Sequence, residues 1–259
     1  TVQESDWNCV LMATANSKNK PFDDVRVRQA LTLAVDRYSA SKYLSNIAIV
    51  KTVGGIVFPG HPLAANQAEM EQLIGYSKDI EASRAKARQL LKDAGVPEGF
   101  KFIFNNRGVD QPYKVVGTWL VDQWRKVGLD PQQTVKPSPQ FYATLRKKYD
   151  FDVSIDFNCQ SVINPIADVS KFLCSAGNNY SQCDNQEIED LYDRLMKAAT
   201  LDEQKAAMRA YEKAAVDFAG SSITLWWYKI NPHRSYVKGW NIAPSHYLNQ
   251  HLDNVWLDQ

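Results

Sequence analysis

Four polar side chains follow a predicted strand closely, and their types suit hydrogen bonding to a small ligand. The strand is expected over residues 151–155, and the side chains are those of Asp156, Asn158, Gln160 and Ser161. Two amides and a hydroxyl donate and accept hydrogen bonds, and one carboxylate adds negative charge, which suits hydroxyl-rich or cationic ligands. The alternative for Asp156 is that it only caps a turn.

Two further residues could touch a ligand. Arg107 follows a predicted strand at residues 100–104 and could reach an anionic group from the rim of a cleft, although an exposed surface arginine is the commoner outcome. Trp226 opens an aromatic run and could offer a ring for stacking, although aromatic residues of strands more often lie in the core.

No catalytic residue is predicted. The sequence has neither a GxSxG nor an HExxH pattern, and its histidines, His61, His233, His246 and His251, are scattered. Paired carboxylates such as Asp23 and Asp24 stand at expected helix starts, where the helix dipole accounts for them. The sequence therefore predicts that the chain is not an enzyme.

The cysteines Cys9, Cys159, Cys174 and Cys183 have no CxxC spacing and no neighbouring histidine, so a zinc site is not expected. They are either structural disulfides or buried thiols. No metal and no cofactor is predicted.

Composition narrows the class of protein. The 259 residues are 44% hydrophobic, with 30 basic and 29 acidic side chains, a net charge of +1. This balance is typical of a folded globular protein, and it lacks the excess of basic residues that would indicate nucleic-acid binding. No apolar run approaches the length that spans a bilayer. The first residues do not resemble an export signal, so any such signal is expected to have been removed or never included.

The order of expected elements alternates between strands and helices. Strands are predicted at residues 10–14, 100–104, 132–135, 151–155, 223–228 and 235–240, and helices from residue 21 and at residues 80–94, 113–127, 138–148, 186–199 and 201–218. Such alternation predicts an α/β layer architecture.

The motif NKPFDDVRVRQAL at residues 19–31, followed by AVDR at 34–37, resembles the signature of the family 5 bacterial solute-binding proteins, the dipeptide- and oligopeptide-binding class. WLVDQWRKVGL at 119–129, YDFDV at 149–153 and Asn164-Pro165 follow in the family's order. The resemblance implies a type II periplasmic-binding-protein-like lobe, with a mixed sheet flanked by helices. Since family members are about twice as long, we expect a fragment.

The family's organisation implies a division of the chain into three segments. Residues 1–21 would form a hinge-proximal strand, residues 22–218 a C-terminal solute-binding lobe, and residues 219–259 a return segment that completes an N-terminal lobe. The strands of that return segment are expected to lack partners here, unless they pair elsewhere or with another chain.

The resemblance also bears on the ligand. Oligopeptide-binding relatives carry a cysteine and, two residues later, an aspartate that binds the ligand's α-amine. Cys159 matches the cysteine, but Ser161 stands at the position of the aspartate, while Ile155 and Asn158 replace the family's arginine and tryptophan. An unpaired buried ammonium is costly, so a polar solute other than a free-amine peptide is expected.

Relatives join cysteines at the positions of Cys9 and Cys159. That match leaves Cys174 and Cys183, nine positions apart, as a second pair, with reduced thiols as the alternative. Two disulfides would indicate an oxidising compartment, the periplasm or a membrane-tethered extracellular location.

The predicted function is that of the substrate-binding component of an ABC importer, which closes about a hinge on a small-molecule solute. Its expected partners are that solute and the transporter's permease, the only route by which it meets the membrane, and the full-length protein is expected to be monomeric. The alternative is a receptor-like interaction module that contacts a membrane sensor or permease without capturing a solute.

Overall fold

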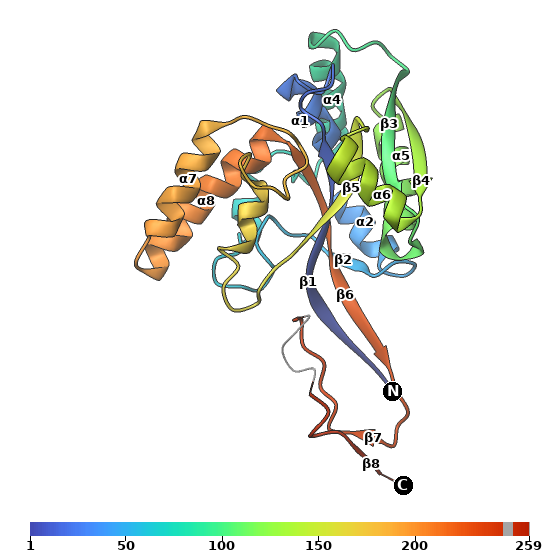
Figure 1. Cartoon of the computed structure of the whole chain (residues 1–259), viewed down its shortest axis with the longest axis vertical. Coiled ribbons are helices and arrows are strands. Elements are labelled where there is room, and N and C mark those ends of the chain that lie inside the picture. Colours follow the sequence, from blue (N-terminus) through green and yellow to red (C-terminus); the bar gives the residue numbers. More distant parts are fainter. Residues whose placement is uncertain (246–250, 259) are drawn as a thin grey trace.

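The computed structural model describes residues 1–245 and 251–258, and a six-stranded mixed sheet forms its centre (Figure 1). The strands lie in the order β2-β6-β1-β5-β3-β4. Their bounds are β1 Val2–Ala15, β2 Val50–Thr52, β3 Phe100–Arg107, β4 Leu129–Lys136, β5 Val153–Cys159 and β6 Ser221–Pro232. A separate pair comprises β7 Val237–Lys238 and β8 Trp256–Leu257.

Helices connect these strands. Their bounds are α1 Val25–Leu33, α2 Arg37–Leu44, α3 Gln67–Met70, α4 Ile80–Asp93, α5 Val115–Arg125, α6 Ser138–Ala143, α7 Gln186–Lys197 and α8 Leu201–Phe218. Three short helical turns complete the set: η1 Asp110–Lys114, η2 Thr144–Lys148 and η3 Asp168–Phe172.

The helices begin where side chains can accept hydrogen bonds from free backbone N–H groups. Asp24 accepts from the backbone N–H of Arg26 at 2.8 Å, which starts α1 a turn later than the proline at which the sequence suggested a helix start. Thr200 and Glu203 form a reciprocal capping box at the start of α8. Local sequence therefore fixes these starts.

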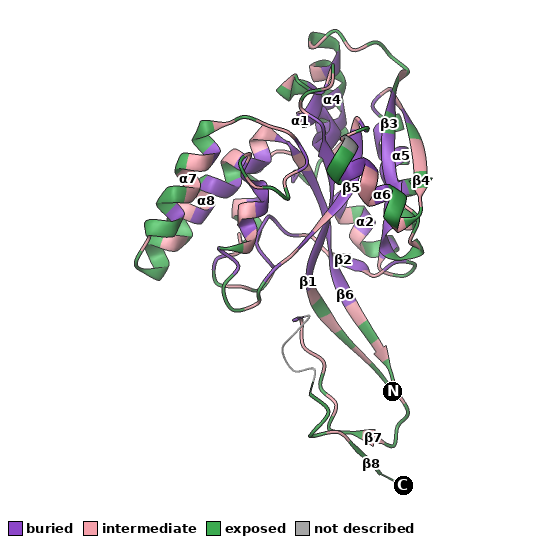
Figure 2. Cartoon of the chain, viewed as in Figure 1, coloured by how far each residue is buried: buried purple, intermediate pink, exposed green. Residues whose placement is uncertain are grey.

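The sheet separates two hydrophobic cores, because successive side chains of a strand point to opposite faces. Leu11 and Ala13 of β1 lie in a core with α1, α4 and α5, whereas Val10 and Met12 lie in a core with α7 and α8. These two groups of helices stand on opposite sides of the central strands (Figure 1), which are buried between them (Figure 2). The chain is thus a layered α/β fold, as the sequence predicted.

A bulge in β6 changes which of its side chains share a face. Val10 pairs with Trp226 and Met12 with Ile223, so β6 has one more residue than β1 between these pairs. As a result Trp226 lies in the α7 and α8 core, and Trp227 lies in the opposite core.

Beyond the helices, β1 and β6 continue as an antiparallel ribbon that reaches the N-terminus (Figure 1). Val2 is 59% exposed and Ile230 is 46% exposed on this ribbon. β6 pairs with β1 and β2, so this return strand has partners within the chain. The division into segments 1–21, 22–218 and 219–259 stays a prediction.

Several strands differ in length from the prediction, and two of them, β5 and β7, differ most in what they imply. β5 does not end at Ile155 but runs to Cys159, because it pairs with β1 from Cys9 to Ala15, and Asp156 and Asn158 therefore lie inside a strand. The strand expected over residues 235–240 shrinks to β7, which pairs with the equally short β8 in the described part of the chain.

Candidate functional site

The carboxyl ends of three parallel strands meet at one edge of the sheet, the place where open α/β sheets bind ligands. β3 is parallel to β4 and to β5, but its pairing with β5 ends at Asn105 and Ser154. Arg107 of β3 and Asp156 of β5 lie beyond that point, where the two strands are no longer paired. The helical turn η1, which follows β3, and the helix α6, which follows β4, both contact β3.

An aromatic cluster of Trp7, Tyr113, Phe157 and Trp227 lies at this edge. The ring centres of Tyr113 and Trp227 are 6.0 Å apart, those of Tyr113 and Phe157 are 6.2 Å apart, and those of Trp7 and Trp227 are 5.4 Å apart. Trp7 and Phe157 are only half-buried. The indole N–H of Trp227 has no hydrogen-bond acceptor among the described residues. Trp7 and Phe157 therefore provide the exposed apolar area of the cluster, and Trp227 contributes a buried donor.

The guanidinium group of Arg107 borders this cluster, and that of Arg146 shares the ring of Tyr142 with it. The Cζ of Arg107 lies 4.8 Å from the ring centre of Tyr113 and 5.2 Å from that of Tyr142, and its Nε donates to Ser138 Oγ at 2.9 Å. The Cζ of Arg146 lies 4.3 Å from the Tyr142 ring centre. Aromatic faces stabilise cations at such distances. Burial raises the pKa of Tyr113 and Arg107 lowers it less, so Tyr113 is a neutral phenol at neutral pH.

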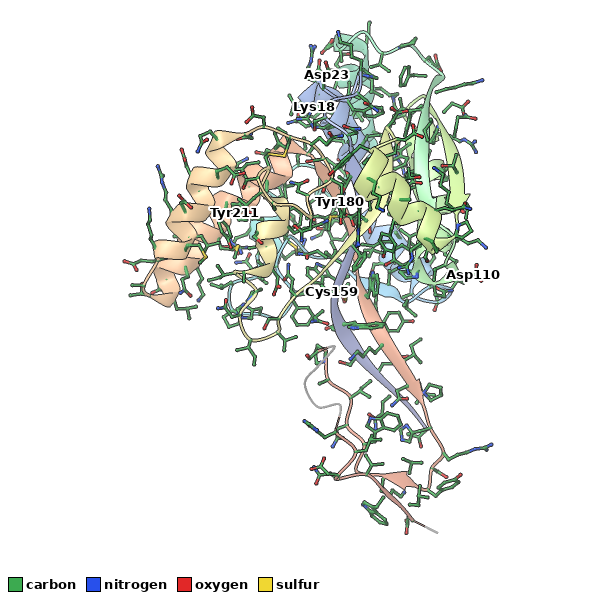
Figure 3. The ribbon with its side chains drawn as sticks, in the orientation of Figure 1. Lys18, Asp23, Asp110, Cys159, Tyr180 and Tyr211 are labelled. Atoms are coloured by element: carbon green, nitrogen blue, oxygen red, sulfur yellow. A yellow bond between two sulfur atoms is a disulfide. The ribbon has the colours of Figure 1, made fainter. Side chains whose placement is uncertain are left out.

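Asp156 does not cap a turn; it forms a buried ion pair. Its Oδ2 lies 2.6 Å from Nζ of Lys171 in η3, and the two side chains are 4% and 5% exposed. The Lys171 ammonium also lies 4.3 Å from the ring centre of Tyr180. Burial raises the pKa of Asp156, and Lys171 opposes that shift. Figure 3 shows Tyr180 near the middle of the molecule, close to the course of β5.

The other polar residues predicted after β5 bind the protein's own loops. Asn158 donates to the carbonyl of Asp168 at 3.2 Å. Gln160 accepts from the backbone N–H of Phe58 at 2.9 Å and donates to the carbonyl of Ile56. These two side chains therefore hold loops in place, and a direct ligand contact by them stays a prediction.

Ser161 is exposed, and its hydroxyl accepts from the backbone N–H groups of Ile163 and Asn164, both at 3.2 Å. Its own backbone N–H donates to Oδ2 of Asp168 at 2.7 Å. A carboxylate thus lies beside position 161, although it comes from η3 and not from the end of β5.

Trp226 is fully buried and lies in the core with α7 and α8. Arg107 contacts Tyr113, which lies in the opposite core. The indole N–H of Trp226 donates to the carbonyl of Gly55 at 3.1 Å, and its ring meets Phe58 edge-on at 5.7 Å. The neighbouring residue Trp227 is the one that lies in the aromatic cluster. A stacking role for Trp226 stays a prediction.

Both cysteine pairs form disulfides in the structure. Cys9 and Cys159 are register partners on β1 and β5 with Cα atoms 3.9 Å apart, and Cys174 and Cys183 have Cα atoms 5.1 Å apart. The first bridge ties β5 to β1 directly beside the aromatic cluster (Cys159 is labelled in Figure 3).

Sequence reasoning missed several residues of this site, namely Tyr113, Tyr142, Arg146, Lys171 and Tyr180. Tyr113 could have been found, because it follows the end of β3 by a few residues. Lys171 and Tyr180 carry no local signal, since tertiary contacts alone bring η3 and the loop after it to β5.

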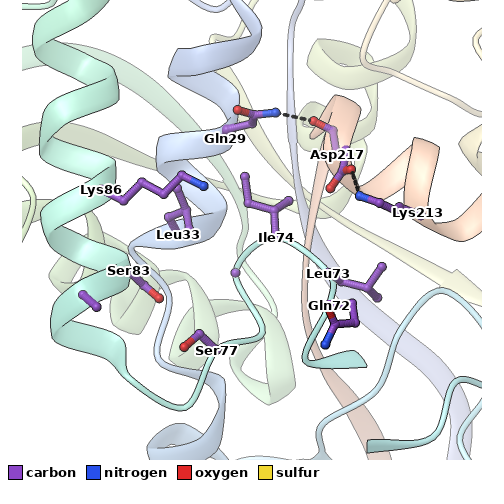
Figure 4. Close-up of a pocket in the computed structure, with 12 residues that line it drawn as sticks. Gln29, Leu33, Gln72, Leu73, Ile74, Ser77, Ser83, Lys86, Lys213 and Asp217 are labelled. Carbon is purple, nitrogen blue, oxygen red and sulfur yellow. Dashed lines mark hydrogen bonds and ion pairs between the residues drawn. The ribbon is translucent and has the colours of Figure 1, made fainter. Parts of the chain in front are cut away.

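A cavity lies away from this site. A cavity of about 500 Å³ opens between α1, α4, α8 and the loop around Gly75 (Figure 4). Gln29 donates to the carbonyl of Asp217 at 2.8 Å on one wall, and Lys213 pairs with the Asp217 carboxylate. Its polar side chains are largely engaged with one another or exposed, so the cavity lacks a converging set of free polar groups.

Neither a metal site nor a membrane span is found in the part of the chain that the structure describes. No group of histidine, cysteine and acidic side chains there could hold an ion. Within residues 1–245 and 251–258, no helix is long and apolar enough to cross a bilayer.

Comparison with known proteins gives one family. The family described as bacterial extracellular solute-binding proteins, family 5 Middle, matches residues 2–180. The dipeptide-binding protein of Escherichia coli is 26% identical over 256 residues, which cover 94% of this chain and 44% of the relative. Di/tripeptide-binding protein 1 of Pseudomonas aeruginosa is 34% identical over 118 residues, 44% of this chain and 20% of that protein.

Solved structures agree on the fold. The complex of Haemophilus influenzae OppA with the peptide RPPGFSPFR superposes with a TM-score of 0.81 at 19% identity, covering all of this chain and 50% of OppA. The periplasmic binding protein DppA of Helicobacter pylori, in complex with the peptide STSA, gives 0.79 at 19% identity. The chain spans about half the length of these relatives.

Proposed function

This chain belongs to the bacterial extracellular solute-binding proteins of family 5, and on that premise we propose that it forms one lobe of a receptor that captures a small solute for an ABC importer. The family is one of solute-binding proteins and not of enzymes, in agreement with the lack of catalytic motifs. The observation that carries the proposal is the aromatic cluster with Arg107 beside it at the carboxyl ends of β3 and β5.

Peptides are the first solutes to consider, because relatives are named as dipeptide-, di/tripeptide- and oligopeptide-binding proteins. The finer proposal is that the solute is polar but is not held by a free α-amine. Ser161 has no charge to offer an ammonium, and the carboxylate beside it, Asp168, belongs to η3 and holds the Ser161 N–H through Oδ2. Asp156 is occupied by Lys171.

The proposed mechanism is closure of two lobes about a hinge. β1 and β6 leave the helical layers as a ribbon whose far end is exposed, and such a ribbon suits a connection to a second lobe. The Cys9 to Cys159 bridge fixes β5 to β1 at the root of that ribbon, so the aromatic cluster would move as a rigid unit with the hinge-proximal strand.

We place the protein in the periplasm or outside the cell, in keeping with its two disulfides and with relatives named as periplasmic. Its partners would be the solute and the permease, through which alone it would meet the membrane, and the protein would act as a monomer.

The test is thermal unfolding of the protein with and without peptides from a tryptic hydrolysate of casein. A binding solute raises the unfolding temperature, because it stabilises only the folded state. Peptides whose amines have been acetylated are expected to stabilise as well as untreated peptides. If acetylation abolishes the effect and Asp168→Asn does the same, an amine contact through Asp168 replaces the finer proposal. No stabilisation, and no compaction by small-angle scattering with any solute, would favour a receptor-like interaction module.

A further inference from the structure

A groove between α2 and α5 exposes apolar side chains on the side of the sheet away from α7 and α8 (Figure 1). Its volume is about 810 Å³. Tyr43 is 43% exposed and Ile47 is 59% exposed on one wall, and Trp119 lines the other. Gln111 fixes the loop that carries Ile47, because its amide donates to the Ile47 carbonyl at 2.7 Å and accepts from the backbone N–H of Ile49 at 3.3 Å. The groove is therefore a fixed surface with apolar area that another protein surface can bury.

A row of charged side chains borders this groove. The row follows η1 and α5 at a spacing of four residues and consists of Asp110, Lys114, Thr118, Asp122 and Lys126, all of which line the groove. Lys114 pairs with Asp110 at 2.6 Å, and Lys126 pairs with Asp122 at 2.7 Å. Along the row the charges are therefore negative, positive, neutral, negative and positive.

This order of charges is complementary to itself when the row is reversed. If a second copy is turned about Thr118, Asp110 lies opposite Lys126 of the second copy, and Lys114 lies opposite its Asp122. The four charged side chains are between 45% and 78% exposed, and Thr118 at the centre is small and exposed. In a parallel arrangement every charge would meet its like, so the charges favour the antiparallel one.

The backbone geometry also allows this arrangement. Residues four apart form ridges on a helix, and two helices most commonly pack with such ridges aligned, at a crossing angle of about 50°. A two-fold contact uses the same patch on both copies, and that patch must be complementary to itself. The row along α5 meets this requirement in both shape and charge.

We propose that this groove and the row of charges beside it form a surface through which two copies of the chain associate about a two-fold axis at Thr118. Tyr43 and Ile47 of each copy would be buried against the other copy. A contact along one helix and one loop is at the small end of protein interfaces, so the association is weak and reversible. Solute capture needs a single copy, and the pairing adds a state at high concentration to the monomer that binds the solute.

The experiment is sedimentation velocity of the protein at concentrations from about 1 μM to about 1 mM. The wild type is expected to form a dimer as its concentration rises, and less of it in about 0.5 M salt, which screens exposed charges. Lys114→Asp and Asp122→Lys should each weaken the dimer at least about tenfold, because each places like charges opposite one another twice in a symmetric pair. The control is Asp193→Lys at an exposed position of α7, which makes the same change of charge as Asp122→Lys and should leave the dimer unchanged.

Exchange of the charges gives a second test. An equal mixture of the Lys114→Asp and Asp122→Lys proteins should form a one-to-one pair, because each reversed charge then meets its opposite. The Lys114→Asp/Asp122→Lys double variant should dimerise again for the same reason. A wild type that stays monomeric at the highest concentration, or single variants that dimerise as the wild type does, would overturn the proposal. Loss of the dimer in the single variants without recovery in the mixture or in the double variant would overturn it too. Solute capture is tested separately, by the thermal shift.

Discussion

Replacing Lys171 with methionine should destabilise the protein strongly at neutral pH, because it leaves the Asp156 carboxylate buried without a partner. The two side chains are 5% and 4% exposed, and their charged atoms are 2.6 Å apart. Removing one member of such a pair costs about 3 to 5 kcal/mol of unfolding free energy. Methionine keeps most of the length of the lysine stem, so little of the loss comes from packing.

The loss should depend on pH in a definite direction. Burial raises the folded-state pKa of Asp156, and Lys171 lowers it, so Lys171→Met raises that pKa further above the value in the unfolded chain. A carboxyl group with a raised folded-state pKa favours folding below its unfolded pKa, and this benefit is lost as pH rises through the folded-state pKa. The deficit of the variant relative to wild type should therefore be largest at pH 7 and shrink as the pH approaches the ordinary pKa of aspartate.

The assay is urea unfolding of wild type and variant, monitored by tryptophan fluorescence. It is carried out at pH 7 and again at a pH near the ordinary pKa of aspartate. The control is the Asp156→Asn/Lys171→Met double variant, which removes the buried charge and should recover much of the stability at pH 7. A deficit below about 1 kcal/mol at pH 7, or one that does not change with pH, would refute the assignment of a buried, charged pair.

Three further outcomes are expected. Reduction should raise the intact mass by two hydrogens for each disulfide bridge. An unchanged mass would show reduced cysteines in place of two disulfides. Gly55→Ala should lower the unfolding temperature because a Cβ there would lie 1.9 Å from Oε1 of the buried Glu212, whereas Gly177→Ala, with nothing within 4 Å, should have little effect. Trp226→Phe should cost about 1 to 3 kcal/mol in urea unfolding, since it leaves the Gly55 carbonyl without its buried donor; a neutral result would mean that water replaces that donor.

The sequence predicted those features that depend on residues close together in the chain. Alternating strand and helix periods predicted the α/β layers, and side chains such as Asp24 start the helices through contacts within one turn. The motif at residues 19–31 predicted the family, which the match over residues 2–180 confirms. The pairing of Cys9 with Cys159 was implied by relatives, and the structure contains that bridge.

The site was less predictable because tertiary contacts assemble it. Asp156 looked like a residue after a strand, yet pairing with β1 extends β5 past it and η3 supplies its lysine. Trp226 and Trp227 are adjacent in sequence, and only the bulge opposite Val10 and Met12 decides which of them meets the aromatic cluster. No pattern in one sequence reveals such a bulge.

The most direct test of solute capture is mass spectrometry of the purified protein under non-denaturing conditions, followed by release of whatever it carries. The account predicts a small solute bound in a one-to-one ratio. A folded protein that carries no solute, and that acquires none from a peptide hydrolysate or a cell extract, would contradict it.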